Sequence, residues 1–262
     1  MIRTIIFLSF YLMSSASHAS ATWQEVSKGL DWISYPDHKI NILRIDPKAW
    51  KFSIHSTSQD KKKKSRSARS WAKHKDLYAT INAGMFHLDH HTHVGYLQQK
   101  KHINSSKINY YKSIALFEPY DNTQPTFQII DTDNQANIQN TIKQYRYATQ
   151  NLRLIKSPGI SRWKSEKKAW IEAALGQDKQ GRALFIFSHK AYRMQVFNAL
   201  LLSLKIDIIS AQHLEGGLQA QLFINPEKID IKALQTHTQQ QIHRQNNHLP
   251  WKIPFVLGIE PR

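Results

Sequence analysis

The 262-residue sequence contains no cysteine. This absence excludes disulfide bonds, thiolate zinc sites, cysteine nucleophiles and Cys-based redox motifs. Acidic residues are also scarce, with 19 Asp and Glu against 36 Lys and Arg, and the formal net charge is +17. Such a charge favours polyanionic partners such as nucleic acid, anionic lipid headgroups or phosphorylated glycans. Because no recognisable nucleic-acid-binding module accompanies the charge, we expect no specific nucleic-acid partner.

Long apolar runs are missing as well. The most apolar one, residues 4–13, is too short to span a bilayer. It follows a single Arg3 and precedes small residues, with small-x-small steps at residues 17–19 and 19–21, as is typical of a cleaved signal peptide. We therefore expect residues 1–19 to be a signal peptide and residues 20–262 to be exported, to the periplasm or as a secreted protein. The alternative is an uncleaved anchor or a buried first helix. We do not expect an integral membrane protein.

What is present is a chain able to form a core, since 41% of its residues are hydrophobic. Stretches that alternate with period two predict strands at 30–35, 39–46, 50–56, 113–117 and 126–130. Residues 169–175 and 183–187 predict a hairpin, and 206–214 a strand that leads into two glycines. Short helices are predicted at 67–75 and within 192–206. Without internal repeats or a clear linker, the pattern predicts the α+β class: a single domain with a mixed, mostly antiparallel β-sheet flanked by a few helices.

Two polar stretches interrupt the apolar pattern. In the first, a strand ends at Asn82, which can donate and accept hydrogen bonds, and Gly84 permits a turn that other residues resist. The second stretch places Gln150, Asn151 and Arg153 in an otherwise apolar strand. The planar guanidinium of an arginine there can bind two phosphate oxygens, or it can pair with a carboxylate for structural reasons.

A third stretch ends the strand at 206–214 with Glu215, Gly216 and Gly217. A carboxylate at a strand end, beside glycines that allow close backbone approach, is a candidate catalytic or ion-binding group, although an ordinary turn has the same composition.

Histidines are concentrated between residues 87 and 93, with Asp89 among them. In an extended segment His87, Asp89, His91 and His93 would project to one side and could bind zinc or copper. A short loop at the rim of an anion-binding cleft explains the same residues, with Asp89 as the group to test first. We expect no dedicated metal site.

Taken in chain order, these stretches resemble the phosphodiester glycosidase family, which includes the lysosomal enzyme that uncovers mannose 6-phosphate tags. The resemblance runs from residue 78 to 223. It is carried by the sequence NAGMF at 82–86, VGY at 94–96, QNLR at 150–153, GQDKQG at 176–181 and LEGG at 214–217. The family pattern has aspartate in the last motif, where this chain has Glu215, and small residues where it has Leu218 and Gln219.

The resemblance implies hydrolysis of a sugar-1-phosphodiester in a phosphorylated glycan or another anionic envelope substrate, without a cofactor. It implies that Glu215, Asp89 and Arg153 are catalytic. The residues it implies for substrate binding are Asn82, Gly84, Gln150, Asn151, Gly216 and Gly217. Two alternatives stay open: a protein that binds an anionic glycan or lipid headgroup without catalysis, and a metal-dependent phosphodiesterase that uses the histidine-rich loop.

Overall fold

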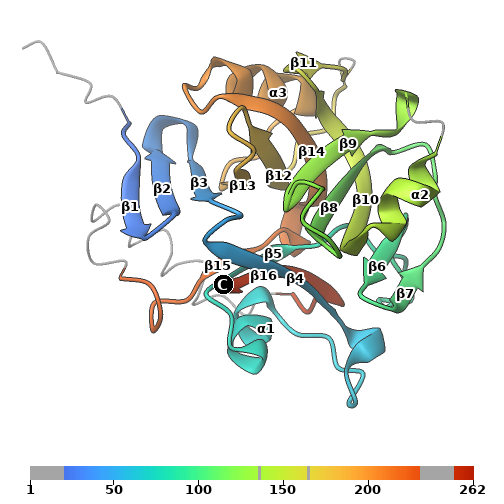
Figure 1. Ribbon diagram of the computed structural model, residues 1–262. Coiled ribbons are helices and arrows are strands. Elements are labelled where there is room, and N and C mark those ends of the chain that lie inside the picture. Colours follow the sequence, from blue (N-terminus) through green and yellow to red (C-terminus); the bar gives the residue numbers. More distant parts are fainter. Residues whose placement is uncertain (1–20, 135–136, 164–165, 231–250) are drawn as a thin grey trace, which may run out of the picture.

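The computed structural model describes residues 21–134, 137–163, 166–230 and 251–262. The expected signal peptide, residues 1–19, lies outside these residues. Two antiparallel β-sheets and three α-helices make up the described part, which confirms the α+β class (Figure 1). No helix among the described residues is both long and apolar enough to cross a bilayer.

The larger sheet contains twelve strands within the described residues, and nine of them follow the order β1-β2-β3-β13-β12-β14-β10-β6-β7. Strand β8 pairs with β10 and β9, and β11 pairs with β10. The strands of this sheet are β1 Gln24–Ser27, β2 Leu30–Tyr35, β3 Ile40–Ile45, β6 Leu97–Gln99, β7 His102–Ser105, β8 Lys112–Pro119, β9 Phe127–Asp131, β10 Tyr145–Lys156, β11 Ile160–Ser161, β12 Glu172–Asp178, β13 Ala183–Ser188 and β14 Ile208–Gly216.

The smaller sheet has four described strands in the order β15-β5-β16-β4. They are β4 Trp50–Ser56, β5 Ala79–Asn82, β15 Leu222–Ile224 and β16 Phe255–Pro261. The described helices are α1 Ala68–Lys75, α2 Ile138–Lys143 and α3 Met194–Ser203. Every pairing among the described strands is antiparallel, which confirms the mostly antiparallel pattern that we expected, and the strands form two sheets.

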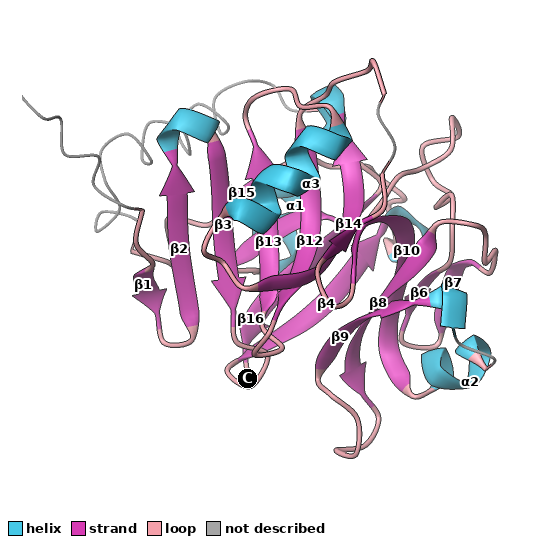
Figure 2. Ribbon diagram, turned by 90° about the horizontal axis from the view of Figure 1, so that it is seen from above, coloured by secondary structure: helices cyan, strands magenta, loops and turns pink. Residues whose placement is uncertain are grey.

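The layers follow from which face of each element is apolar. The main core lies between the two sheets and contains buried side chains such as Trp32, Phe52 and Leu214. A second core packs α3 on the outer face of the large sheet, and a third packs α1 on the outer face of the small sheet. Figure 2 shows α3 lying across the strands of the large sheet. The order of the layers is therefore helix, large sheet, small sheet, helix.

Several local predictions are confirmed. The segments 30–35 and 50–56 coincide with β2 and β4. The helix expected at 67–75 is α1, which begins after Ser67, whose side chain accepts a hydrogen bond from the backbone of Ser70 at 3.1 Å. The strand that reaches Glu215 is β14. The strand that contains Gln150, Asn151 and Arg153 is β10, which is 12 residues long.

Candidate active site

Strand β14 delivers Glu215 to one end of the large sheet, where the pairing is irregular. The register between β12 and β14 shifts between Ala173 and Ala174, and Glu215 lies opposite Ala173. Only 7% of Glu215 is exposed. Its Oε1 accepts a hydrogen bond from the backbone N–H of Gly216 at 2.9 Å. The strand therefore ends on a carboxylate that is nearly enclosed and has one backbone partner.

A buried carboxylate–imidazole pair lies beside Glu215. His213 Nδ1 is 2.6 Å from Glu172 Oε1, and Trp170 Nε1 donates to Glu172 Oε2 at 2.8 Å. Both partners of the pair are buried. His213 and Glu215 lie on either side of the register shift in β14, and the charges of His213 and Glu172 both act on Glu215. The structure thus brings two carboxylates and one imidazole together at this end of the sheet.

The pKa values of Glu215 and His213 are both raised above those of exposed groups. Burial raises the pKa of Glu215 to about 7, against the smaller opposing effects of the Gly216 N–H and His213. Burial would lower the pKa of His213, but the charge and hydrogen bond of Glu172 outweigh it and raise that pKa. Glu215 therefore changes its charge near neutral pH beside an imidazole that favours the protonated form, and groups of this kind suit general acid–base catalysis.

The two glycines after Glu215 fit different requirements. A Cβ on Gly216 would lie 2.6 Å from Trp170 Cδ1, so only glycine fits against the indole that holds Glu172. Gly217 has φ +68, a left-handed conformation that glycine adopts without strain, and it begins a short 3₁₀ turn at Gly217–Gln219. The glycine pair therefore lets the chain turn sharply while the Trp170 ring stays close to it.

Asn82 fixes the other end of this turn. Its side-chain Nδ2 donates to the carbonyl of Gln219 at 3.0 Å, and its Oδ1 accepts from the backbone N–H of Gln221 at 2.6 Å. Asn82 is buried at the end of β5, in the smaller sheet. It connects the two sheets at the segment that follows Glu215, and so positions this segment.

A second polar cluster surrounds Gly84. A Cβ at this position would lie 2.1 Å from His93 Nε2 and 2.4 Å from Asn151 Oδ1. Thr149 Oγ1 donates to the carbonyl of Ala83 at 2.6 Å and accepts from Asn151 Nδ2 at 3.1 Å. Burial lowers the pKa of His93 to about 4, so its ring is neutral at pH 7. Asn151 is fully buried, and a hydrogen bond between its side chain and His93 partly opposes the decrease in the His93 pKa.

This arrangement can be compared with known proteins. The sequence profile described as phosphodiester glycosidase matches residues 75–260, well over half of the chain. The chain belongs to the phosphodiester glycosidase family. The matched segment contains both polar clusters. No curated protein matches the chain.

Solved structures share the fold of this family member. A hypothetical protein from Synechocystis has a TM-score of 0.63 and 12% identity over 94% of this chain, and the chain covers only 65% of that protein. The catalytic domain of zebrafish N-acetylglucosamine-1-phosphodiester alpha-N-acetylglucosaminidase, auto-inhibited by its pro-peptide, has a TM-score of 0.62 and 11% identity. The match covers 92% of this chain and 82% of the zebrafish chain.

The remaining residues singled out from the sequence have other partners in this glycosidase-family chain. Gln150 is fully buried, and its amide binds the backbone of Asn109 through both ends, at 3.0 and 2.8 Å. Arg153 pairs with Asp131 at 3.1 Å and Asp133 at 2.5 Å. The hydrogen bond from Arg153 holds the pKa of Asp133 well below its usual range. Among the described residues, no hydrogen bond or ion pair joins Gln150 or Arg153 to Glu215.

The histidine-rich segment is a tight turn, and not the extended segment in which its side chains would project to one side. Phe86 and His93 bridge its two ends, and His90 has φ 55. Asp89 closes the turn by accepting from the Thr92 hydroxyl at 2.6 Å and from two backbone N–H groups, and the Thr92 bonds lower its pKa to about 2. His91 lies instead beside Thr57, at 3.2 Å. The described residues contain no group of three His, Cys, Asp or Glu side chains arranged to hold a metal ion.

Sequence reasoning missed Glu172, His213 and His93. One signal for the first was an acidic residue at the start of the apolar strand predicted by residues 169–175. For His213, the signal was a titratable side chain two residues before Glu215 on the same predicted strand. His93 was considered only as part of a metal cluster. The signal that could have singled it out is the glycine at position 84, against which His93 packs closely.

Proposed function

We propose that this protein hydrolyses a sugar-1-phosphodiester and that Glu215 is its general acid–base. The observation that supports this most is the pKa of Glu215, raised to about 7 by burial, beside the His213–Glu172 pair. A group that titrates near the working pH is present in both protonation states and transfers protons most effectively. Membership of the phosphodiester glycosidase family supports the same class of reaction.

The chemistry follows from the bond that breaks. Water attacks C1 of the sugar, the bond between C1 and the phosphate oxygen breaks, and the electron pair leaves with a phosphomonoester. Ionised Glu215 accepts a proton from the attacking water or stabilises the positive charge that develops at C1. A phosphate monoester is a good leaving group, so the reaction depends less on a strong acid than the hydrolysis of an ordinary glycoside does.

The surrounding residues bind and position in this proposal. His213, held by Glu172 at 2.6 Å, supplies a fixed imidazole next to Glu215. Gly216 and Gly217 are partly exposed at the end of β14, and Asn82 fixes the turn that follows. In the second cluster, Asn151 is fully buried and packs closely against Gly84, so both residues support the site from within the fold.

The substrate and compartment belong to the same proposal. The excess of 36 basic over 19 acidic residues favours an anionic, phosphorylated glycan. The first 19 residues, with the pattern of a signal peptide, support export to the periplasm or secretion. An envelope glycan carrying sugar-1-phosphodiesters would meet both conditions.

The test is product analysis with the purified protein and a synthetic sugar-1-phosphodiester. The wild type is expected to release free sugar and phosphomonoester in equal amounts. Glu215→Gln, which keeps the size of the side chain, is expected to lower kcat by about 10²- to 10⁴-fold. Glu227→Gln, in an exposed loop residue that pairs with Lys73, is the matched control and should retain full activity. Binding of the phosphodiester without turnover by the wild type would instead identify a binding protein.

A further inference from the structure

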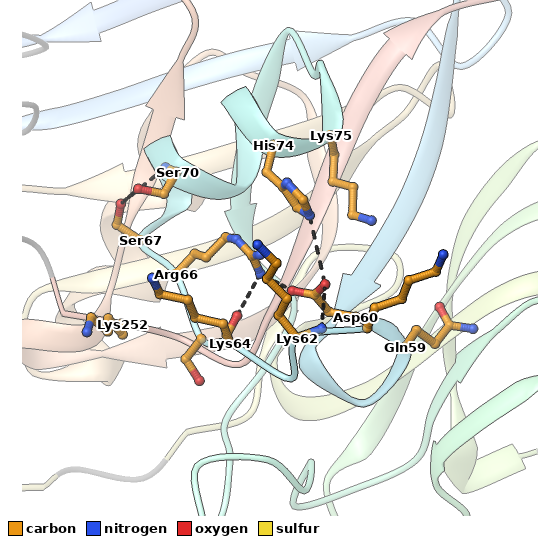
Figure 3. Close-up of a pocket in the computed structure, with 12 residues that line it drawn as sticks. Gln59, Asp60, Lys62, Lys64, Arg66, Ser67, Ser70, His74, Lys75 and Lys252 are labelled. Atoms are coloured by element: carbon orange, nitrogen blue, oxygen red, sulfur yellow. Dashed lines mark hydrogen bonds and ion pairs between the residues drawn. The ribbon is translucent and has the colours of Figure 1, made fainter.

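A basic cavity of about 850 Å³ lies away from the Glu215 cluster, between the loop at residues 59–67 and helix α1 (Figure 3). Its lining has one carboxylate, Asp60, which pairs with Arg66 and lies 4.0 Å from His74. The cations in the lining are Lys61, Lys62, Lys64, Arg66, Lys75 and Lys252. Because Arg66 compensates Asp60, the lysines are left as a surplus of positive charge around the cavity.

A second basic hollow, of about 540 Å³, lies on the other side of Gln59, which lines both. It is lined by Lys100, Lys101 and Arg146 and by no acidic residue. Lysines from both hollows affect the pKa of the same residue, His55. Burial lowers its pKa to about 4, and Lys75 from the first hollow and Lys100 from the second both contribute to the decrease. A lysine from each hollow is therefore close enough to His55 to act on the same imidazole.

The second hollow also contains a buried donor without a partner. Gln99 is 1% exposed, and its Oε1 accepts a hydrogen bond from Ser56 Oγ at 2.7 Å. Its Nε2 has no hydrogen-bond partner among the described residues. Leaving a buried donor unsatisfied costs about 1–3 kcal/mol, which an acceptor brought next to this side chain would remove. Because Gln99 also lines the hollow, this amide is consistent with an acceptor-rich ligand.

We propose that the two hollows form one groove that binds the extended chain of a phosphorylated glycan. Several separate ammonium groups suit a ligand whose negative charges are spaced along a chain, and not a single phosphate. Tyr120 is the only Phe, Tyr or Trp in the lining of either hollow within the described residues, and Arg146 covers its ring at 4.7 Å. Single-stranded nucleic acid depends on free aromatic faces for base stacking, so the groove favours a glycan.

The groove is connected to the candidate active site. The backbone N–H of Ala68, at the start of α1, donates to Gln221 Oε1 at 2.8 Å, and the backbone of Gln221 is held by Asn82. The helix that forms one wall of the groove is thus fixed to the segment that follows Glu215. The identity of the bound chain as part of the substrate rests on the proposed function. The affinity of the groove for such a chain does not depend on that function.

The experiment measures binding and turnover separately. The probe is a synthetic tetrasaccharide joined by sugar-1-phosphodiesters, with the single-unit phosphodiester as comparison, in the Glu215→Gln background to prevent cleavage. The groove variant replaces Lys62, Lys64, Lys100 and Lys101, all exposed, by alanine. The control variant replaces four exposed lysines outside the groove, Lys28, Lys48, Lys51 and Lys179, and so changes the net charge equally.

The groove variant is expected to bind the tetrasaccharide roughly tenfold more weakly than the control, since four contacts between exposed charges contribute a factor of about two each. In the active protein, it should leave kcat for the single unit unchanged. Equal affinity of the groove and control variants would overturn the proposal, as would tighter binding of a dT10 oligonucleotide or of anionic vesicles than of the tetrasaccharide. Selective binding without hydrolysis by the wild type would keep the groove and refute the proposed function.

Discussion

Glu215→Gln is expected to make the protein more stable above neutral pH while it removes activity. In the folded protein burial raises the pKa of Glu215 from 4.5 to about 7. A carboxyl whose folded pKa lies above its unfolded value contributes stability that is fully present below pH 4.5 and is lost as the pH rises to about 7. The shift corresponds to roughly 3 kcal/mol of lost stability once Glu215 is ionised. Glutamine is neutral at every pH and can still accept the hydrogen bond from Gly216, so the variant avoids this loss.

The assay is chemical denaturation of both proteins at pH 5 and pH 8. The free energy of unfolding of the variant minus that of the wild type should increase by roughly 2–3 kcal/mol between the two values. Taking the difference at each pH cancels the titration of other groups that the two proteins share. A difference that stays constant from pH 5 to pH 8 would refute the reasoning, because it would mean that Glu215 ionises in the folded protein as readily as in water.

Three further predictions concern stability around the site. Gly84→Ala should destabilise the fold by about 1–3 kcal/mol more than Gly181→Ala, measured by urea denaturation, because both glycines have positive φ but only Gly84 has neighbours in the way. Arg153→Leu should lower stability at pH 7 and leave kcat unchanged. The stability that this variant loses relative to the wild type should shrink as the pH falls, because Asp133, whose pKa the arginine lowers, then takes up a proton. A large loss of kcat at unchanged stability would contradict this structural role. Asn82→Ala should cost about 1–3 kcal/mol in thermal or chemical unfolding through its two lost hydrogen bonds, and an unchanged midpoint would show that the turn after Glu215 is held by other contacts.

The sequence was sufficient for the α+β class and for the position of Glu215, because both depend on local signals. Period-two alternation marks the strands, and a strand followed by two glycines marks an exposed turn. The pairing of His213 with Glu172 could not be predicted from local signals of this kind. Glu172 lies 41 positions earlier on another strand, and the register that joins β12 to β14 contains a shift that no local pattern encodes.

Arg153 illustrates the opposite difficulty. Its residue type and its place in an apolar strand fit a phosphate clamp and a structural ion pair equally well. The choice depends on whether carboxylates reach it in the fold, and here Asp131 does so from the end of β9 and Asp133 from the turn that follows. The histidine-rich loop is similar, because its metal-binding potential depended on an extended backbone and Asp89 instead closes a turn.

The central claim is that the bond between the sugar carbon and the phosphate oxygen breaks. Hydrolysis of a sugar-1-phosphodiester in water enriched with ¹⁸O tests it most directly, with mass analysis of both products. The account predicts that the label appears on C1 of the released sugar and that the phosphomonoester stays unlabelled. Label in the phosphomonoester would contradict it, because water would then have attacked phosphorus and the protein would act as a phosphodiesterase.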